Sequence, residues 1–352
     1  MSQINVDAIR ASNGTGDAIS LTASSNTCTA NITNYPHRNA LINGGMQVSQ
    51  YASTNSAINT YGPLDRWRTI GGPMGFTISQ VTDGTNYPNT HTALKAHRTE
   101  GNTQEYDLGV LQGIETLNSR PFAGKQCTFS FRARVGANFS GPSSVLKAFV
   151  WTGTGTDDQP ASMTNHNSSL MTDITVSTTA TKYSVTYTIP SSVTQISCGV
   201  YYQCRGTAGA NDWFEITDCQ FEAGPVATDF EIRDYGAELA KCQRYFHRIE
   251  AGNGHVVGIG GAALDASNMA YDVIFPVSMR AIPTYEGSAT AMRFAANDDS
   301  DERNFNQLSI WNTGTVSGVS LLQNSSGGAT GGQSGHLQFR ANDGFMNFSA
   351  EL

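Results

Sequence analysis

The stretch CTFSFRARV (residues 127–135) alternates apolar and polar side chains with a period of two. In an extended chain, Cys127, Phe129, Phe131, Ala133 and Val135 share one face, and the intervening Thr, Ser and Arg side chains share the other. This alternation predicts a β-strand that is buried on one side only.

The same period of two recurs between residues 61 and 230. It is clear in YSVTYTI (183–189) and weaker in FTISQVT (76–82) and WFEITDCQF (213–221). Turn-forming stretches such as GTGTDDQP (153–160) and RGTAGAND (205–212) separate these runs. No strand–helix–strand alternation is seen, which disfavours a doubly wound or TIM-type scaffold. Short strands with such spacers predict an antiparallel β-sandwich, of jelly-roll type.

The composition agrees with an all-β protein of more than one compact unit. The chain has 352 residues, more than the usual single domain, and 36 of them are glycine. Only 14% are charged, which favours strands and turns over helical bundles, and 39% are hydrophobic, enough for folded cores.

The charge pattern bears on partners and location. The formal net charge is −8, and no run of Lys or Arg is present, so we expect no nucleic-acid binding. No apolar run approaches the roughly 20 residues that span a bilayer, so we expect no membrane insertion. The sequence MSQINVDAIRASNG at the start has no secretion signal, which predicts a soluble protein synthesised in a cytosol.

Four segments are predicted along the chain. Residues 1–40 are rich in Asn, Thr and Ser with scattered single apolar residues, and they predict an extended N-terminal arm, either a mobile tail or one that orders on a partner. Residues 41–232 are the jelly roll, 233–250 a short connecting helix, and 251–352 a C-terminal β-sandwich domain, which is the candidate receptor-binding domain.

The connecting helix is predicted from RDYGAELAKCQRYFHRIE (233–250), in which Asp234 can cap the N-terminus. Its apolar stripe follows helical spacing and consists of Tyr235, Leu239, Cys242, Phe246 and Ile249. After it, strand-like runs return in HVVGIGGAAL (255–264), AYDVIFPVS (270–278), QLSIW (307–311) and HLQFRAND (336–343). Pro276 and Pro283 fit strand edges or turns.

Signals of catalysis are weak, and we expect no enzyme activity, no catalytic residues and no cofactor. The sequence has no HExxH motif and no GxSxG motif. Paired carboxylates of a glycosidase are the more serious alternative. Candidates are Asp157, Asp158, Asp212, Glu215, Asp298, Asp299, Asp301 and Glu302. The acidic run NDDSDERN (297–304) lacks EF-hand spacing, so a solvated loop is favoured over a Ca²⁺ site and no metal site is predicted.

Aromatic side chains are the candidates for binding sugars. The four tryptophans, Trp67, Trp151, Trp213 and Trp311, are the obvious platforms. Trp67 and Trp213 lie in apolar stretches and are predicted to be core residues. Trp311, beside a turn in the last domain, is the predicted ligand-binding residue, although a core position is an equal alternative.

Six cysteines are present without a CxxC pair, which argues against a zinc site. Buried free thiols are favoured, because a protein without a secretion signal meets a reducing compartment. A disulfide between Cys198 and Cys204 stays open.

Several motifs together carry a family resemblance. PHRNALINGGMQVSQ (36–50) followed by GPLDRWRTIGG (62–72) resembles the start of carbohydrate-binding-module-like jelly rolls in tail-fibre and appendage proteins of bacteriophages, especially those of marine and cyanobacterial hosts. QGIETLNSRPFAGKQCTFSFRARV (112–135) resembles a strand pair of that module. ITDCQFEAGPVATDFEIRDYGAELAKCQRYFHR (216–248) resembles its closing strand and exit helix, and FPVSMRAIPTYEGSA (275–289) the strand of a following β-domain.

The resemblance implies a homotrimer in a virion, as a tail or capsid appendage. It implies that residues 1–40 attach to other virion proteins and that the partner outside the particle is a host surface polysaccharide. If the jelly roll starts near Tyr61, the segment around Gly44 and Gly45 crosses its surface, with Leu41, Ile42, Met46 and Val48 tucked against the sheet. Tyr51 stands where the family commonly has Arg.

The function expected from these features is that of a virion fibre or receptor-binding protein that attaches to host surface glycans without catalysis. Two alternatives stay open. One is a purely structural head or tail appendage or decoration protein, and the other is a glycan depolymerase spike.

Overall fold

The computed structural model of the protein describes residues 8–10, 17–22, 27–30, 38–251, 256–287, 292–296, 302–304, 307–310, 314–324, 331–332, 334–339 and 344–352. The chain divides into two compact units, Met1–Asn39 and Ala40–Leu352. Each unit is described by itself.

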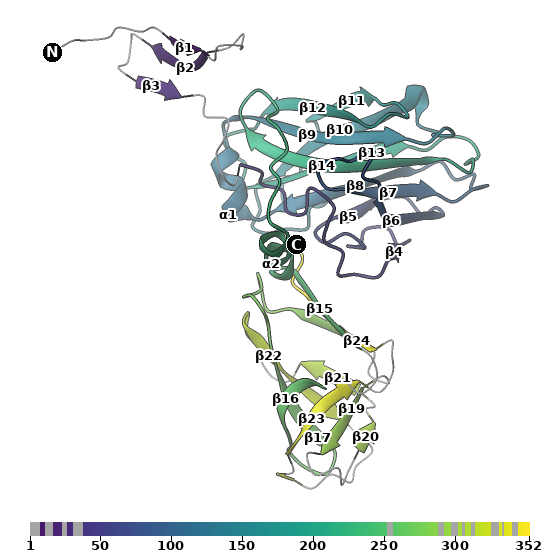
Figure 1. The fold of residues 1–352 in the computed structure, drawn as a ribbon, viewed down its shortest axis with the longest axis vertical. Coiled ribbons are helices and arrows are strands. Elements are labelled where there is room, and N and C mark those ends of the chain that lie inside the picture. The colour runs from purple at the N-terminus through teal and green to yellow at the C-terminus, as the bar shows by residue number, and fades with distance from the viewer. Residues whose placement is uncertain are drawn as a thin grey trace, which may run out of the picture. The chain divides into compact units, whose positions relative to one another are not determined.

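The first unit contains a three-stranded antiparallel sheet (Figure 1). Its strands, in sheet order, are β1 (Ala8–Arg10), β2 (Asp17–Thr22) and β3 (Thr27–Ala30). The segment expected to be an extended arm thus contains paired strands.

The second unit begins with a sandwich of two antiparallel sheets (Figure 1). The five-stranded sheet runs in the order β11 (Met171–Thr175), β10 (Val145–Gly153), β13 (Gln195–Gln203), β8 (Asp107–Ile114) and β5 (Arg68–Gly71). The six-stranded sheet runs in the order β12 (Thr181–Thr188), β9 (Gln126–Val135), β14 (Trp213–Ala223), β7 (Thr92–Arg98), β6 (Phe76–Thr82) and β4 (Thr54–Asn55). The jelly-roll-type β-sandwich predicted from the alternating runs is confirmed.

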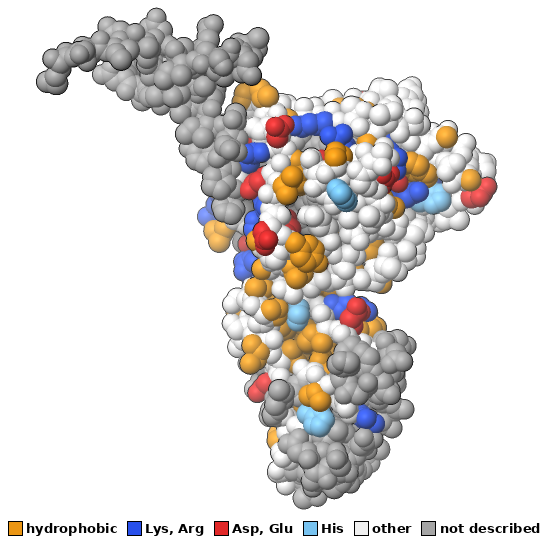
Figure 2. Space-filling view, in the orientation of Figure 1, with side chains coloured by type: hydrophobic (Ala, Val, Ile, Leu, Met, Phe, Trp, Pro, Cys, Tyr) orange, Lys and Arg blue, Asp and Glu red, His pale blue; other side chains and the backbone are white. Residues whose placement is uncertain are grey.

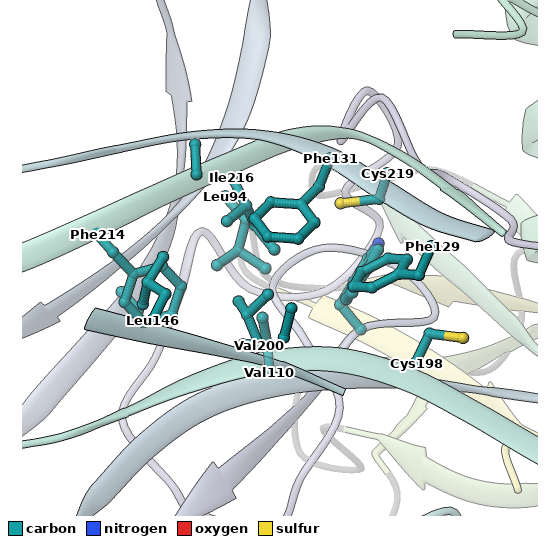
Figure 3. Close-up of a cluster of buried hydrophobic side chains, with 14 of the residues drawn as sticks. Leu94, Val110, Phe129, Phe131, Leu146, Cys198, Val200, Phe214, Ile216 and Cys219 are labelled. Atoms are coloured by element: carbon teal, nitrogen blue, oxygen red, sulfur yellow. The ribbon is translucent and has the colours of Figure 1, made fainter. Parts of the chain in front are cut away.

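The main core lies between these two sheets. The apolar side of β9, including Phe129 and Phe131, is fully buried, as its alternation predicts. Figure 3 shows these rings meeting Val110 of β8 and Val200 of β13 from the opposite sheet. Burial of each such side chain contributes about 1.5–3 kcal/mol to folding.

The segment before the first sheet packs as expected. Leu41, Met46 and Val48 are fully buried. The side-chain amide of Gln112 accepts a hydrogen bond from the Ile42 N–H and donates one to the Ile42 carbonyl. A Cβ on Gly45 would stand 2.6 Å from the side chain of Thr90, so only glycine permits this close approach.

Short helices occur at the edges of the sandwich and after it. They are α1 (Thr116–Ser119), the 3₁₀ turns η1 (Arg120–Phe122) and η2 (Pro142–Ser144), and α2 (Tyr235–Gln243). In α2 the Asp234 carboxylate accepts a hydrogen bond from the Ala237 amide at 3.1 Å, so the predicted N-cap is confirmed.

The prediction that this helix continues to residue 250 is wrong. The helix ends at Gln243, and Phe246–Ala251 forms strand β15, whose residues pair with β24 from Ser349 to Gly344. The alternation of FHRIEA fits a strand as well as a helix, and a neighbouring strand decides between them. Phe246 and Ile249 therefore belong to a sheet and not to a helical stripe.

The C-terminal region forms a second sandwich, as predicted. Its three-stranded sheet runs in the order β15, β24 (Gly344–Ser349) and β18 (Thr284–Gly287). Its seven-stranded sheet runs in the order β20 (Glu302–Asn304), β19 (Met292–Ala296), β23 (Ser334–Phe339), β16 (Val256–Ala263), β17 (Asn268–Ile274), β22 (Gly318–Asn324) and β21 (Gln307–Ile310). A separate core takes side chains from both sheets, among them Phe348, Met346, Tyr271 and Leu337.

Candidate functional site

The outer face of the five-stranded sheet carries an apolar cluster that is separate from the main core. In β10, Leu146, Ala148 and Val150 point into the sandwich, so Phe149 and Trp151 point outward. Phe149 is nonetheless fully buried, because it packs in a cluster with Met171 and Tyr201 of the neighbouring strands β11 and β13 and with Leu111 and Ile70 further along the sheet. A strand with apolar residues on both faces is unusual where its outer face meets water. We therefore take this face as the candidate site.

The aromatic rings of this cluster lie against one another in defined geometries. Phe149 and Trp151 stack with centroids 4.1 Å apart and an interplanar angle of 22°. Tyr201 contacts Phe149 at 5.9 Å, and His166 meets Trp151 edge-on at 5.1 Å. These contacts fix the orientation of the half-buried indole ring. Its Nε1–H is buried and has no hydrogen-bond partner within the described structure.

Two glycines create the space for the rings. Gly199 of β13 stands opposite Phe149, and a Cβ there would lie 2.7 Å from the Phe149 ring and 2.3 Å from a backbone oxygen. A Cβ on Gly72 would lie 2.3 Å from the ring of Tyr106. Because both side chains are absent, the rings lie close to the sheet backbone.

Trp151, Tyr201 and Tyr106 border an open cavity of about 430 Å³ on this face. Its apolar lining comes from Ile70, Trp151 and Met171, and polar groups come from Ser168 and Asp107. Burial raises the pKa of Asp107 above its usual range. Open apolar depressions with a few polar groups are sites that suit polar ligands with flat apolar faces, and this cavity has that character. Sugar rings are ligands of this kind.

One ion pair lies beside the cavity-lining residue Tyr201. Lys147 and Asp173, which stand opposite one another on β10 and β11, form an ion pair at 2.7 Å. On the face of the molecule in view in Figure 2, Lys/Arg and Asp/Glu side chains lie near one another within a mostly uncharged surface.

The tryptophans predicted as platforms are placed differently from one another. Trp67 is a core residue, as predicted, and donates its indole N–H to the Asn43 carbonyl at 3.0 Å. Trp311, the predicted ligand-binding residue, lies outside the described residues. Trp151 was not singled out from the others, although the two-sided apolar pattern of VLKAFVWTG (145–153) was the signal that distinguishes it.

The core position predicted for Trp213 is wrong. Alternation along β14 puts Phe214 in the core, so Trp213 faces outward from the six-stranded sheet. There it is half-buried, because the Lys95 ammonium lies 4.4 Å over its ring and the Arg134 guanidinium 5.5 Å away.

Two of the candidate catalytic carboxylates hold buried structural contacts. Asp212 is fully buried and pairs with Arg98 at 3.3 Å. Glu215 pairs with Arg134 at 2.7 Å and accepts a hydrogen bond from the Tyr87 hydroxyl at 2.6 Å. Neither lines the cavity of the candidate site.

The other candidates lie in loops or outside the described structure. Asp157 accepts a hydrogen bond from the Thr116 amide, and Asp158 one from the Thr164 amide, both at 2.8 Å. The Asp158 contact is the local one expected of Asp in a turn, whereas Asp157 joins two distant segments and also pairs with Arg280 at 3.4 Å. The side chains of Asp298, Asp299, Asp301 and Glu302 lie outside the described part of the chain.

The cysteines are free where the structure describes them. Cys198 and Cys204 are both fully buried thiols, so no disulfide joins them. Burial raises the pKa of the Cys204 thiol to about 11, which keeps it protonated at neutral pH.

The described residues contain neither a metal-binding cluster nor a membrane-spanning helix. No cluster of three or more His, Cys, Asp and Glu side chains there could hold a metal ion. No helix in the described ranges has both the length and the apolar character needed to cross a bilayer.

Comparison with known proteins gives structural neighbours only. No family model and no curated protein matches the sequence. Among solved structures, the enzymatically active domain of tailspike protein 4 from bacteriophage CBA120 is 14% identical over 54% of this chain, with a TM-score of 0.35. The match covers 22% of that tailspike chain.

Carbohydrate-binding modules are among the other structural neighbours. TmCBM61, solved with β-1,4-galactotriose, is 16% identical over 53% of this chain and 99% of its own, with a TM-score of 0.33. The CBM22-1–GH10 modules of Clostridium thermocellum xylanase 10B, solved with xylohexaose, are 13% identical over 53% of this chain and 30% of that chain, with a TM-score of 0.31. At these TM-scores the similarities carry no further conclusion about this chain.

Proposed function

We propose that this protein binds glycans through the outer face of the five-stranded sheet, without catalysis, as a receptor-binding fibre of a bacteriophage virion. The observation that carries the proposal is the aromatic cavity on that face. Trp151, which stacks on the buried Phe149 ring, lines an open depression of about 430 Å³ together with Tyr201 and Tyr106. The apolar faces of sugar rings pack on such aromatic side chains.

Polar groups at the cavity can orient a bound sugar through hydrogen bonds. The Asp107 carboxylate is an acceptor for hydroxyl groups, and the Ser168 hydroxyl, which also lines the cavity, can donate. Aromatic stacking of this kind tolerates different sugars, while one donor and one acceptor favour a particular hydroxyl pattern.

The virion part of the proposal rests on the sequence resemblance. Residues 1–40 would attach the chain to other virion proteins, and a homotrimer would present three copies of the cavity. Because each site is open and shallow, single-site affinity is weak, and several copies per particle would compensate by avidity.

A glycan array probed with the full chain tests the proposal. Trp151→Ala should lower the affinity for any bound glycan by about tenfold or more. Trp213→Ala is the matched control, since it removes an indole from the outer face of the other sheet. Unchanged binding by Trp151→Ala, with loss in Trp213→Ala, would refute the site. If the wild-type chain binds no glycan, the proposed function is wrong and a structural virion role takes its place.

A further inference from the structure

A second pocket lies where the jelly roll meets the three-stranded sheet of the C-terminal region. It has a volume of about 290 Å³ and is lined by the jelly-roll residues Tyr51 and Tyr61 together with residues of β15, β18 and β24. It shares no lining residue with the cavity on the five-stranded sheet.

The register of the three-stranded sheet gives this pocket a polar floor. Phe246, Ser349 and Thr284 pair in one row across the sheet, and Asn347 and Glu286 pair in the next row. Alternate residues of the same strands, such as Phe348, point to the C-terminal core. The floor therefore combines hydroxyl, amide and carboxylate groups on one face.

The jelly roll supplies an aromatic wall that is fixed in place. The ring of Tyr51 stacks on Phe246 with centroids 3.6 Å apart and an interplanar angle of 12°. Gln50 Nε2 donates to the Phe246 carbonyl at 2.9 Å, and the Tyr61 hydroxyl donates to the Leu352 carbonyl at 3.0 Å. These contacts preform the wall, so a ligand would not have to order it.

The polar groups on the floor are oriented, and one of them carries a charge without a counter-ion. Arg248 donates to Asn347 Oδ1 at 3.3 Å, which leaves the Asn347 amide nitrogen pointing to Glu286 Oε2 at 3.4 Å. Glu286 is exposed and has no ion-pair partner among the residues that the structure describes. The ionised Glu286 carboxylate can accept a hydrogen bond from a hydroxyl group, and the second N–H of the Asn347 amide can donate one to a neighbouring hydroxyl.

We infer that this pocket is a second saccharide site, which takes a single uncharged sugar unit. Its volume is at the small end for ligand pockets, so it fits the end of a glycan better than a long chain segment. The carboxylate of Glu286 disfavours acidic sugars by like-charge repulsion. This second site uses residues other than those of the first cavity, so an experiment can refute one of the two sites without refuting the other.

Titration of the full chain with methyl glycosides of neutral hexoses, observed by saturation-transfer NMR, tests the inference. We expect saturable binding with a Kd of about 1 mM. Glu286→Gln should weaken it by about tenfold, because the neutral amide oxygen is a weaker hydrogen-bond acceptor than the carboxylate. The controls are Asp272→Asn, an exposed carboxylate of β17 outside the pocket, and Trp151→Ala.

The outcomes distinguish the two sites. Loss of binding in Glu286→Gln alone supports the second site, while the unfolding temperature of that variant confirms that it is folded. Loss in Trp151→Ala with full binding in Glu286→Gln assigns the sugar to the first cavity and overturns the inference. Absence of saturable binding in the wild-type chain, or equal binding of an acidic sugar such as a methyl sialoside, also overturns it.

Discussion

The guanidinium of Arg66, which precedes β5, lies over the ring of Tyr245, which follows α2, with its Cζ atom 3.5 Å from the ring centroid. Both side chains are almost completely buried. Arg66 also forms an ion pair with Glu351 and donates to the Gly113 carbonyl at 2.8 Å. One cation therefore joins the jelly roll to the last residues of the C-terminal sandwich.

Removal of the anion from this pair should destabilise the protein. Glu351→Ala leaves the Arg66 charge buried without its partner, so we expect the free energy of unfolding to fall by about 3–5 kcal/mol. Denaturant titration of the variant measures this change. Glu105→Ala is the control, because its pair with Arg205 is exposed and the expected change is below about 1 kcal/mol. Equal effects of the two variants would contradict the role of Arg66.

Asp65 should make stability depend on pH. Burial raises the pKa of this carboxyl from 3.8 to about 6, although Gln50 donates to it at 2.7 Å. Because the folded pKa lies above the unfolded pKa, the stabilising contribution is fully present below about pH 4 and is lost as the pH rises through about 6.

Asp65→Asn tests this dependence. The stability of the variant relative to wild type should rise between pH 4 and pH 7.5 by up to about 3 kcal/mol, as measured by denaturant titration at each pH. Asp158→Asn is the control, since hydrogen bonds donated by Thr164 lower the pKa of that partly exposed carboxyl. A difference between wild type and Asp65→Asn that is the same at every pH would show that Asp65 does not titrate in this range.

Gly72→Ala should disturb the aromatic cavity while the fold stays intact. The new methyl group would displace the ring of Tyr106, which is 42% exposed and free to move into solvent. We expect a several-fold loss of glycan affinity, measured by calorimetry, and a change in unfolding free energy below about 1 kcal/mol. Gly331→Ala lies outside the cavity and should change neither quantity. Unchanged glycan affinity in Gly72→Ala would show that Tyr106 does not contribute to glycan binding.

The short helix α2 should depend on its N-cap. Asp234→Ala removes the hydrogen bond to the Ala237 amide, which is expected to cost about 0.5–2 kcal/mol. Thermal unfolding of the variant measures the loss. Asp234→Asn should recover most of it, because the amide oxygen still accepts the bond. No loss in Asp234→Ala would show that contacts such as the buried Glu238 carboxylate hold this helix without the cap.

Local alternation was enough to predict the jelly roll. The apolar side of CTFSFRARV is buried in β9 as predicted, but Thr128 and Ser130 on the other side are buried as well, so only Arg132 and Arg134 leave that side partly exposed. The burial of Leu41 and Met46 was predicted as well. By contrast, β15 could not be told from a helix, since its partner β24 lies about 100 residues away in sequence and only tertiary pairing decides.

The candidate site was less predictable than the fold. It brings together Ile70, Trp151 and Tyr201 from three strands. Their contact cannot be predicted from any single stretch of the sequence. The pattern of Phe149 and Trp151 opposite a buried face was a usable signal. The position of Trp213 could not be predicted, because the cations that cover its ring come from β7 and β9.

The most direct test of the central claim is hydrogen–deuterium exchange of the full chain with and without the glycan that it binds most tightly. The account predicts that the glycan slows exchange in residues 68–72, 106–111, 147–153 and 197–203, which surround the aromatic cavity. Slowed exchange confined to the six-stranded sheet or to residues 256–339, with no change around Trp151, would contradict it.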